Sequence, residues 1–167
     1  MRSIILMGPP GSGKSTVGKF LAKDLNLTLV DTDRVIEDRQ GRSISEIFLS
    51  EGEDGFRAIE KEVVLETLKQ DNCIIALGGG SILDSEVQNV LSQCPEVIFL
   101  DVSISNAAPR VGFNKERPLL MGNPRQQWLQ LMEKRRGIYE RLATRTISTD
   151  NRKANEVAHE IAAGVKP

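Results

Sequence analysis

The sequence predicts a single α/β domain in which helices cover both faces of a parallel β-sheet. Short apolar runs alternate with longer helical patterns along the chain, and this alternation is typical of parallel sheets. The chain has 167 residues, of which 40% are hydrophobic and 27% are charged. This length and composition suit one compact domain with its own core. We therefore expect residues 1–167 to form one domain.

Five apolar runs are predicted to be the strands. A strand that is covered on both faces is short and nearly continuous in apolar residues. The runs lie at residues 4–7, 28–30, 73–77 and 97–100, with a weaker one at 146–148.

Helical patterns fill most of the segments between these strands. They lie at residues 14–24, 34–40, 44–50, 53–69, 85–91, 125–142 and 154–163. Ser43 and Glu46 have the spacing of a capping box at the start of the third pattern. Residues 111–124 combine glycines and prolines with charges, and a loop this long in a compact domain is usually functional, often as a lid.

Composition argues against several classes of partner. Twenty-two Lys and Arg are interspersed with 23 Asp and Glu, and aromatic residues make up only 4%, so neither a basic patch nor a stacking platform for nucleic acid is expected. The sequence shows no signal-peptide pattern and no apolar run near the ~20 residues of a membrane span. Cys73 and Cys94 lack the spacing of a zinc site or a disulfide framework. We expect a cytoplasmic monomer without nucleic-acid or membrane partners.

Residues 8–16 fit the Walker A phosphate-binding loop, between a predicted strand and a predicted helix. The glycines of this loop let successive N–H groups face phosphate oxygens, and the helix adds the positive end of its dipole. Lys14 is expected to reach the β- and γ-phosphates, and Ser15 to offer its hydroxyl to Mg²⁺. Residues 114–117 end in Arg, where a guanine-specific loop needs Asp, so we expect ATP. The predicted ATP-binding residues of the loop are Gly11, Ser12, Gly13, Lys14, Ser15 and Thr16.

Two carboxylates follow the second predicted strand. Asp31 and Asp33 are two residues apart, so both can face one site at the carboxyl edge of the sheet, where such folds bind ligands. Asp31 would hold a Mg²⁺-bound water, and Asp33 would accept the proton of an acceptor hydroxyl. The alternative for one of them is a helix N-cap. Residues 78–80 are three glycines after the third strand, either a backbone donor site for substrate or a flexible turn.

The phosphate loop, residues 31–33 and the three glycines occur along the chain together with residues 56–60, 117–120 and 136–139. In the order and approximate spacing of these motifs, essentially the whole chain resembles the shikimate kinase family. The resemblance implies the three-layer P-loop kinase fold, with a five-stranded parallel sheet flanked by helices. It also implies an acceptor-binding region at residues 31–62, a lid at about 111–124, and Mg²⁺-dependent transfer of the γ-phosphoryl group of ATP to shikimate.

The family grips the substrate carboxylate with two arginines, matched here to Arg57 and Arg136. An arginine fork gives a carboxylate two parallel charge-assisted hydrogen bonds, and Glu60 is placed to hold Arg57. Arg136 is preferred over Arg135 because it continues an apolar row, which favours an inward side chain. That row is Leu129, Met132, Arg136 and Tyr139. A surface salt bridge is the alternative for each arginine.

The same resemblance implies that Asp33 and the backbone of Gly79 and Gly80 contact the substrate. Arg117 is matched to the lid arginine that meets the transferring phosphoryl group, so the predicted catalytic residues are Lys14, Asp33 and Arg117. Arg110 and Arg152 are expected on the two sides of adenine, and Asp101 is interpreted as structural. The alternative functions are a related kinase for another acceptor, such as gluconate or a nucleoside monophosphate, and a non-catalytic nucleotide-binding protein.

Overall fold

The structure is a computed structural model that describes residues 2–111 and 123–165. Its sheet has five parallel strands in the order β2-β3-β1-β4-β5, which confirms the predicted class. Each strand overlaps the run predicted for it, with ends that differ by at most one residue. The strands are β1 (Ile4–Met7), β2 (Thr28–Asp31), β3 (Cys73–Ala76), β4 (Val97–Asp101) and β5 (Arg145–Ser148).

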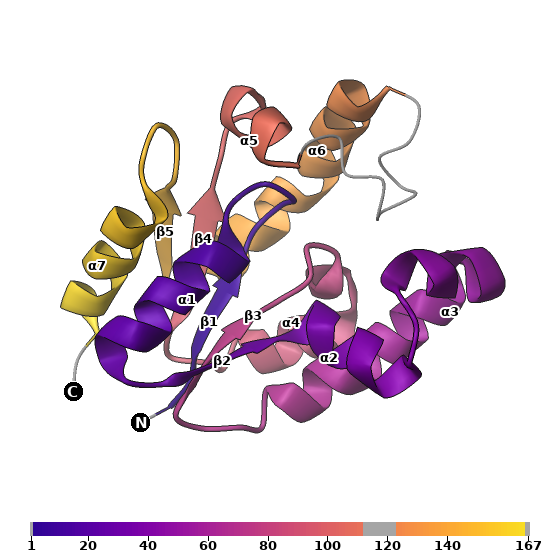
Figure 1. Ribbon diagram of the computed structural model, residues 1–167, viewed down its shortest axis with the longest axis horizontal. Coiled ribbons are helices and arrows are strands. Elements are labelled where there is room, and N and C mark those ends of the chain that lie inside the picture. The colour runs from indigo at the N-terminus through magenta and orange to yellow at the C-terminus, as the bar shows by residue number, and fades with distance from the viewer. Residues whose placement is uncertain (1, 112–122, 166–167) are drawn as a thin grey trace.

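Helices pack on both faces of this sheet (Figure 1). On one face α1 and α7 lie side by side, and α3, α4 and α6 cover the other. The helices are α1 (Lys14–Leu25), α2 (Thr32–Gln40), α3 (Ile44–Thr67), α4 (Ser85–Leu91), α5 (Ile104–Val111), α6 (Pro124–Leu142) and α7 (Ala154–Gly164), with the short 3₁₀-helix η1 at Ser81–Leu83. The three-layer arrangement that the resemblance implied is therefore present.

The two layers of core follow from the alternation of side chains along β1. Ile5 and Met7 belong to the cluster formed with α3, α4 and α6, whereas Ile4 and Leu6 belong to the cluster formed with α1 and α7. Successive strand residues face opposite sides of a sheet, so a continuous apolar run such as this one supplies both layers. All four residues are at most 2% exposed.

The strand register brings three loops to one edge of the sheet. Leu6 of β1 and Asp31 of β2 both pair with Ala76 of β3, so the strands end at the same level. The loops that follow β1, β2 and β3 therefore leave side by side at the carboxyl edge, where ligands of open α/β sheets bind.

Two helical segments differ from the predicted pattern. Residues 44–67 form a single α3, although Gly52 within it is non-helical, with φ 71° and ψ −176°, so the two predicted helices meet at a kink that glycine permits. The capping box is confirmed, because the Ser43 hydroxyl accepts from the Glu46 N–H at 3.1 Å and the Glu46 carboxylate accepts from the Ser43 N–H at 3.2 Å. No helix was expected at α5, which contains Pro109; it forms where Ala107 is fully buried.

Most of the predicted lid lies outside the described residues. Val111 ends α5 and Pro124 begins α6, and Arg117 falls between them in the part that is not described. No described helix combines the length and the apolar character needed to cross a membrane.

Candidate active site

The loop between β1 and α1 depends on glycine. Gly11 and Gly13 have φ of 84° and 90°, values that disfavour residues with a Cβ. A Cβ on Gly11 would also lie 2.8 Å from the carbonyl oxygen of Ala107. The loop borders a cavity of about 360 Å³, lined by Pro10, Gly11, Gly13, Lys14, Ser15, Thr16, Asp31, Asp33, Ala76, Leu77, Gly79, Arg110 and Val111. The structure thus brings the predicted phosphate loop and both predicted aspartates to one cavity.

The Lys14 ammonium lies against the loop itself. Its Nζ donates to the carbonyl oxygens of Gly8 at 2.7 Å and of Pro9 at 3.1 Å. A flexible four-carbon stem lets an ammonium exchange such carbonyls for other oxygens. Lys14 is therefore placed to meet phosphate at the mouth of the loop.

Asp31 caps α2 through one carboxylate oxygen and contacts Ser15 through the other. One carboxylate oxygen caps α2, accepting from the N–H groups of Asp33 at 3.1 Å and Arg34 at 3.5 Å. The other accepts from the Ser15 hydroxyl at 2.7 Å. These oxygens suit Mg²⁺, which proteins bind through one or two oxygen ligands, with waters and phosphates completing the octahedron. No group of three or more His, Cys, Asp or Glu residues in the described chain could hold a metal ion by itself.

The glycines at residues 78–80 leave room for charged side chains. A Cβ on Gly78 would lie 2.6 Å from Asp33 Oδ1 and 3.0 Å from Glu60 Oε2, and one on Gly80 would collide with the Arg57 guanidinium. The glycine loop, as we call residues 78–80, therefore passes in direct contact with Asp33, Glu60 and Arg57. A side chain on Gly78 or Gly80 would displace the groups predicted to bind the acceptor.

Arg57 is held by Glu60, as predicted. The Arg57 Nη1 lies 2.8 Å from Glu60 Oε1, and Glu60 is only 2% exposed. Arg57 Nε and the Ser81 hydroxyl are buried and have no hydrogen-bond partner among the described residues. Buried polar groups are normally paired, so these two groups are the kind that a bound polar ligand satisfies.

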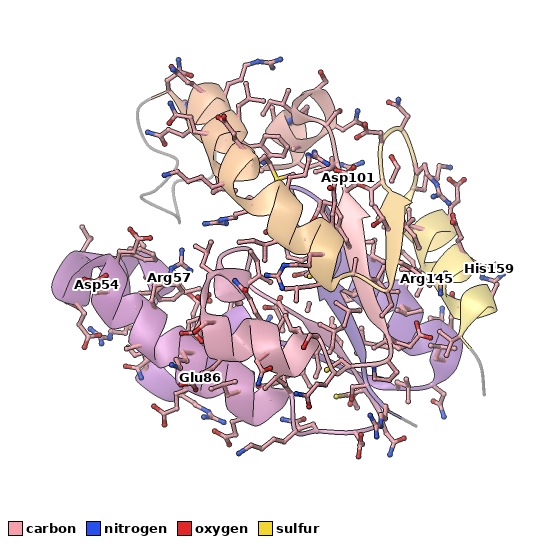
Figure 2. The ribbon with its side chains drawn as sticks, turned by 180° about the vertical axis from the view of Figure 1, so that it is seen from behind. Asp54, Arg57, Glu86, Asp101, Arg145 and His159 are labelled. Atoms are coloured by element: carbon pink, nitrogen blue, oxygen red, sulfur yellow. The ribbon has the colours of Figure 1, made fainter. Side chains whose placement is uncertain are left out.

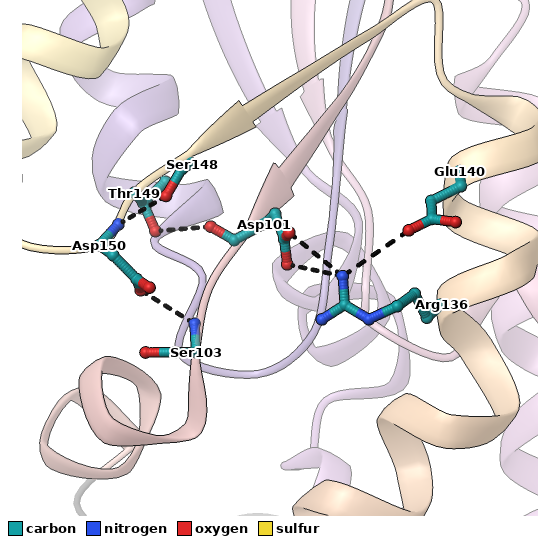
Figure 3. A network of polar contacts seen from close by, with 7 residues as sticks. All are labelled: Asp101, Ser103, Arg136, Glu140, Ser148, Thr149 and Asp150. Atoms are coloured by element: carbon teal, nitrogen blue, oxygen red, sulfur yellow. Dashed lines mark hydrogen bonds and ion pairs between the residues drawn. The ribbon is translucent and has the colours of Figure 1, made fainter.

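The inward arginine of α6 is Arg135, and the prediction that the Arg136 side chain turns inward is wrong. Arg136 Nη1 lies 3.1 Å from both carboxylate oxygens of Asp101 and 3.8 Å from Glu140, as Figure 3 shows, and its side chain is 41% exposed. Figure 2 shows Asp101 well apart from Arg57, so the Arg136 guanidinium, which is paired with Asp101, lies away from Arg57. Arg135 is 6% exposed, and a Cβ on Gly79 would lie 3.4 Å from its Nη1.

The error came from the choice between two helical rows that share residues. The buried face of α6 alternates spacings of four and three residues, whereas Leu129 of the predicted row is 47% exposed. The buried residues of this face are Trp128, Met132, Arg135, Tyr139 and Leu142. Including Trp128 and Leu142 in the row would have pointed to Arg135. Asp101, interpreted as structural, is engaged by Arg136, and its carbonyl oxygen accepts from the Thr149 hydroxyl at 3.2 Å (Figure 3).

Arg110 and Arg152 lie together beside the phosphate loop. Arg110 donates to the carbonyl of Thr149 at 2.8 Å and to that of Gly11 at 3.2 Å. Arg152 donates to the Ser148 carbonyl at 3.1 Å and pairs with Glu160 at 2.6 Å. Both arginines line a cavity of about 240 Å³, together with Ser12, Gly13, Thr16, Val17, Thr149, Ala154 and Val157. The two arginines predicted to flank adenine thus line one cavity beside the phosphate loop.

Comparison with known proteins gives one consistent result. A family model described as shikimate kinase matches residues 10–166. A shikimate kinase from Streptomyces coelicolor is 47% identical over 154 residues, covering 92% of this chain and 90% of that protein. The solved shikimate kinase from Acinetobacter baumannii in complex with shikimate superimposes with a TM-score of 0.94 at 34% identity, covering 99% of this chain and 96% of that one. A gluconokinase from Sinorhizobium meliloti, with a TM-score of 0.60, 22% identity and coverage of 98% and 90%, shares the fold alone. The chain therefore belongs to the shikimate kinase family.

Proposed function

We propose that this protein transfers the γ-phosphoryl group of ATP to a hydroxyl of shikimate, giving ADP and shikimate 3-phosphate. The observation that carries this proposal is the extent of the cavity beside the phosphate loop. It runs from Lys14 and Ser15 of the phosphate loop to Asp33 and Gly79. The donor cradle thus opens onto the same space as Asp33 and Gly79, as a direct phosphoryl transfer requires, while Arg57 and Gly80 line a second cavity of about 250 Å³.

Asp33 is the residue we assign to the acceptor hydroxyl. Its carboxylate lies against the glycine loop and lines the same cavity as Lys14. It would accept the proton of the hydroxyl while the oxygen attacks the γ-phosphorus in line and ADP leaves. Lys14 would stabilise the charge that develops on the phosphoryl oxygens. Arg117 lies outside the described residues, and its role against the same charge stays a prediction from the sequence.

We assign the carboxylate of shikimate to Arg57 and Arg135. Both guanidinium groups lie against the glycine loop, at Gly80 and Gly79 respectively. Planar guanidinium groups recognise carboxylates through paired hydrogen bonds, and the buried Arg57 Nε is available as a donor among the described residues. The Arg57–Glu60 pair fixes one of the two forks before substrate arrives.

Mg²⁺ fits the Ser15 and Asp31 oxygens. When bound there, it would neutralise part of the charge on the phosphate oxygens. Asp31 keeps its helix-capping bonds through the other carboxylate oxygen, so α2 need not rearrange for the metal to bind.

The test is ADP release from Mg²⁺-ATP with and without shikimate, with gluconate and AMP as alternative acceptors. Release that depends on shikimate supports the proposal, because it reports acceptor and reaction together. Equal or greater turnover with gluconate or AMP would overturn the acceptor assignment. Binding of ATP without turnover on any of the three would favour the non-catalytic alternative.

We also propose that the protein acts as one domain and as a monomer. The described residues form one five-stranded sheet with its flanking helices. Light scattering at working concentration tests this, and a mass twice that of the 18.4 kDa chain would contradict it.

A further inference from the structure

Helix α6 makes two side-chain hydrogen bonds to the loops of the site. Trp128 Nε1 donates to the carbonyl oxygen of Pro10 in the phosphate loop at 2.8 Å, and the Tyr139 hydroxyl donates to the carbonyl oxygen of Gly79 at 2.6 Å. Trp128 is 4% exposed and Tyr139 is fully buried. One helix therefore holds the backbone of the loop predicted to bind ATP and of the loop predicted to bind the acceptor.

The Tyr139 ring is fixed by packing before its hydroxyl reaches the loop. It stacks on Phe99 of β4, with ring centroids 4.9 Å apart and an interplanar angle of 14°. Both rings are fully buried, and close-packed interiors leave such side chains little freedom. The direction of the hydroxyl is thus set by the sheet.

The bond to Gly79 also determines where the next N–H group points. The carbonyl of Gly79 and the N–H of Gly80 belong to one peptide unit, which is trans and planar. In such a unit the C=O and N–H bonds point in opposite directions, so the Gly80 N–H faces away from Tyr139. A peptide between two glycines has few steric limits on rotation, and the hydroxyl supplies the missing constraint.

The Gly80 N–H has no partner of its own in the described part of the chain. The neighbouring loop bonds use the Ser81 N–H, which donates to the Gly78 carbonyl, and the Gly78 N–H, which donates to the Thr32 hydroxyl. Gly80 is nevertheless a buried residue, and buried backbone donors are nearly always paired. This donor is therefore one that a ligand oxygen can satisfy.

We propose that Tyr139 is a positioning residue for the acceptor. Its hydroxyl holds the Gly79–Gly80 peptide so that the Gly80 N–H meets an oxygen of the bound acceptor. Tyr139 itself does not touch the reacting atoms. The inference rests on the proposed function, which places shikimate against the glycine loop.

The test is Tyr139→Phe, which removes the hydroxyl and keeps the stacked ring. Loss of one hydrogen bond of this kind corresponds to about a fivefold change in an equilibrium. We expect KM and Kd for shikimate to rise by about fivefold, with KM for ATP within about twofold of the unsubstituted protein. Shikimate binding is measured by calorimetry as well as by turnover.

Thr67→Val is the matched control. Thr67 is 1% exposed and its hydroxyl donates to the Val63 carbonyl at 2.7 Å within α3, so this variant also loses one buried hydroxyl bond but touches neither loop. We expect it to lower the melting temperature and leave shikimate binding unchanged. The proposal is overturned if Tyr139→Phe binds shikimate as tightly as the unsubstituted protein, or if both variants weaken shikimate and ATP alike. Turnover of shikimate by the unsubstituted protein is measured first, so a failure of the proposed function is recognised separately.

Discussion

Replacing each of the two neighbouring arginines of α6 separates their roles. Arg135 is 6% exposed and lies against Gly79, whereas the Arg136 side chain is 41% exposed and paired with Asp101. We expect Arg135→Ala to impair shikimate binding and Arg136→Ala to leave it nearly intact. The two substitutions remove the same side chain from adjacent positions, so each serves as the control for the other.

The expected magnitudes follow from the two environments. A guanidinium fork makes two charge-assisted hydrogen bonds of at least about 1.5 kcal/mol each, so losing it costs about 3 kcal/mol or more, over a hundredfold in kcat/KM for shikimate. Arg135→Lys keeps the charge but loses the fork, and we expect it to lower kcat/KM for shikimate by about tenfold. An exposed ion pair is worth at most about 1 kcal/mol, so Arg136→Ala is expected to lower the melting temperature by about 2–4 °C.

The assay is ADP release at varied shikimate and saturating ATP, with calorimetric binding of shikimate and thermal unfolding for each variant. For each of these variants, KM for ATP is expected to stay within about twofold of the value for the unsubstituted protein. If Arg136→Ala loses shikimate binding while Arg135→Ala keeps it, the assignment based on burial is refuted and the row that includes Leu129 was the correct one. Thermal unfolding identifies any loss of activity that comes from loss of the fold.

Three further predictions test other parts of the site and the fold. Asp33→Asn is expected to lower kcat by about 10²- to 10⁴-fold, the usual contribution of a general base, with ATP affinity unchanged by calorimetry; retained turnover would remove Asp33 from the mechanism. Asp31→Asn is expected to raise the Mg²⁺ concentration needed for half-maximal activity, and an unchanged Mg²⁺ titration would place the metal elsewhere. Gly52→Ala forces a backbone conformation that is essentially restricted to glycine, at about 1–3 kcal/mol, and is expected to lower the melting temperature. Gly137→Ala, in α6 with open space at its Cβ, should raise the melting temperature instead. A change of melting temperature in the same direction for both variants would contradict the different backbone roles assigned to the two glycines.

Local patterns in the sequence were enough for the fold class and for the phosphate loop. β1 is apolar on both faces, so its four residues predict a covered parallel strand. The glycines at positions 11 and 13 have positive φ, and the loop that needs them has a fixed spacing that is readable without coordinates. These features depend on neighbours along the chain, which is why the sequence alone determined them.

The orientation of each element against the rest of the molecule required the tertiary structure. Both candidate rows of α6 contain Met132 and Tyr139, and a period of 3.6 residues tolerates either Arg135 or Arg136 between them. Only the packing of α6 on Phe99 and the glycine loop decides which arginine turns inward. From the sequence, Asp31 was likewise either a helix cap or a carboxylate beside the metal. The structure shows that one of its oxygens accepts from the Asp33 N–H and the other from the Ser15 hydroxyl. The sequence thus determined which residue types the site contains. The packing of the helices on the sheet decided which of these residues reach it, because that packing depends on contacts between residues far apart in the chain.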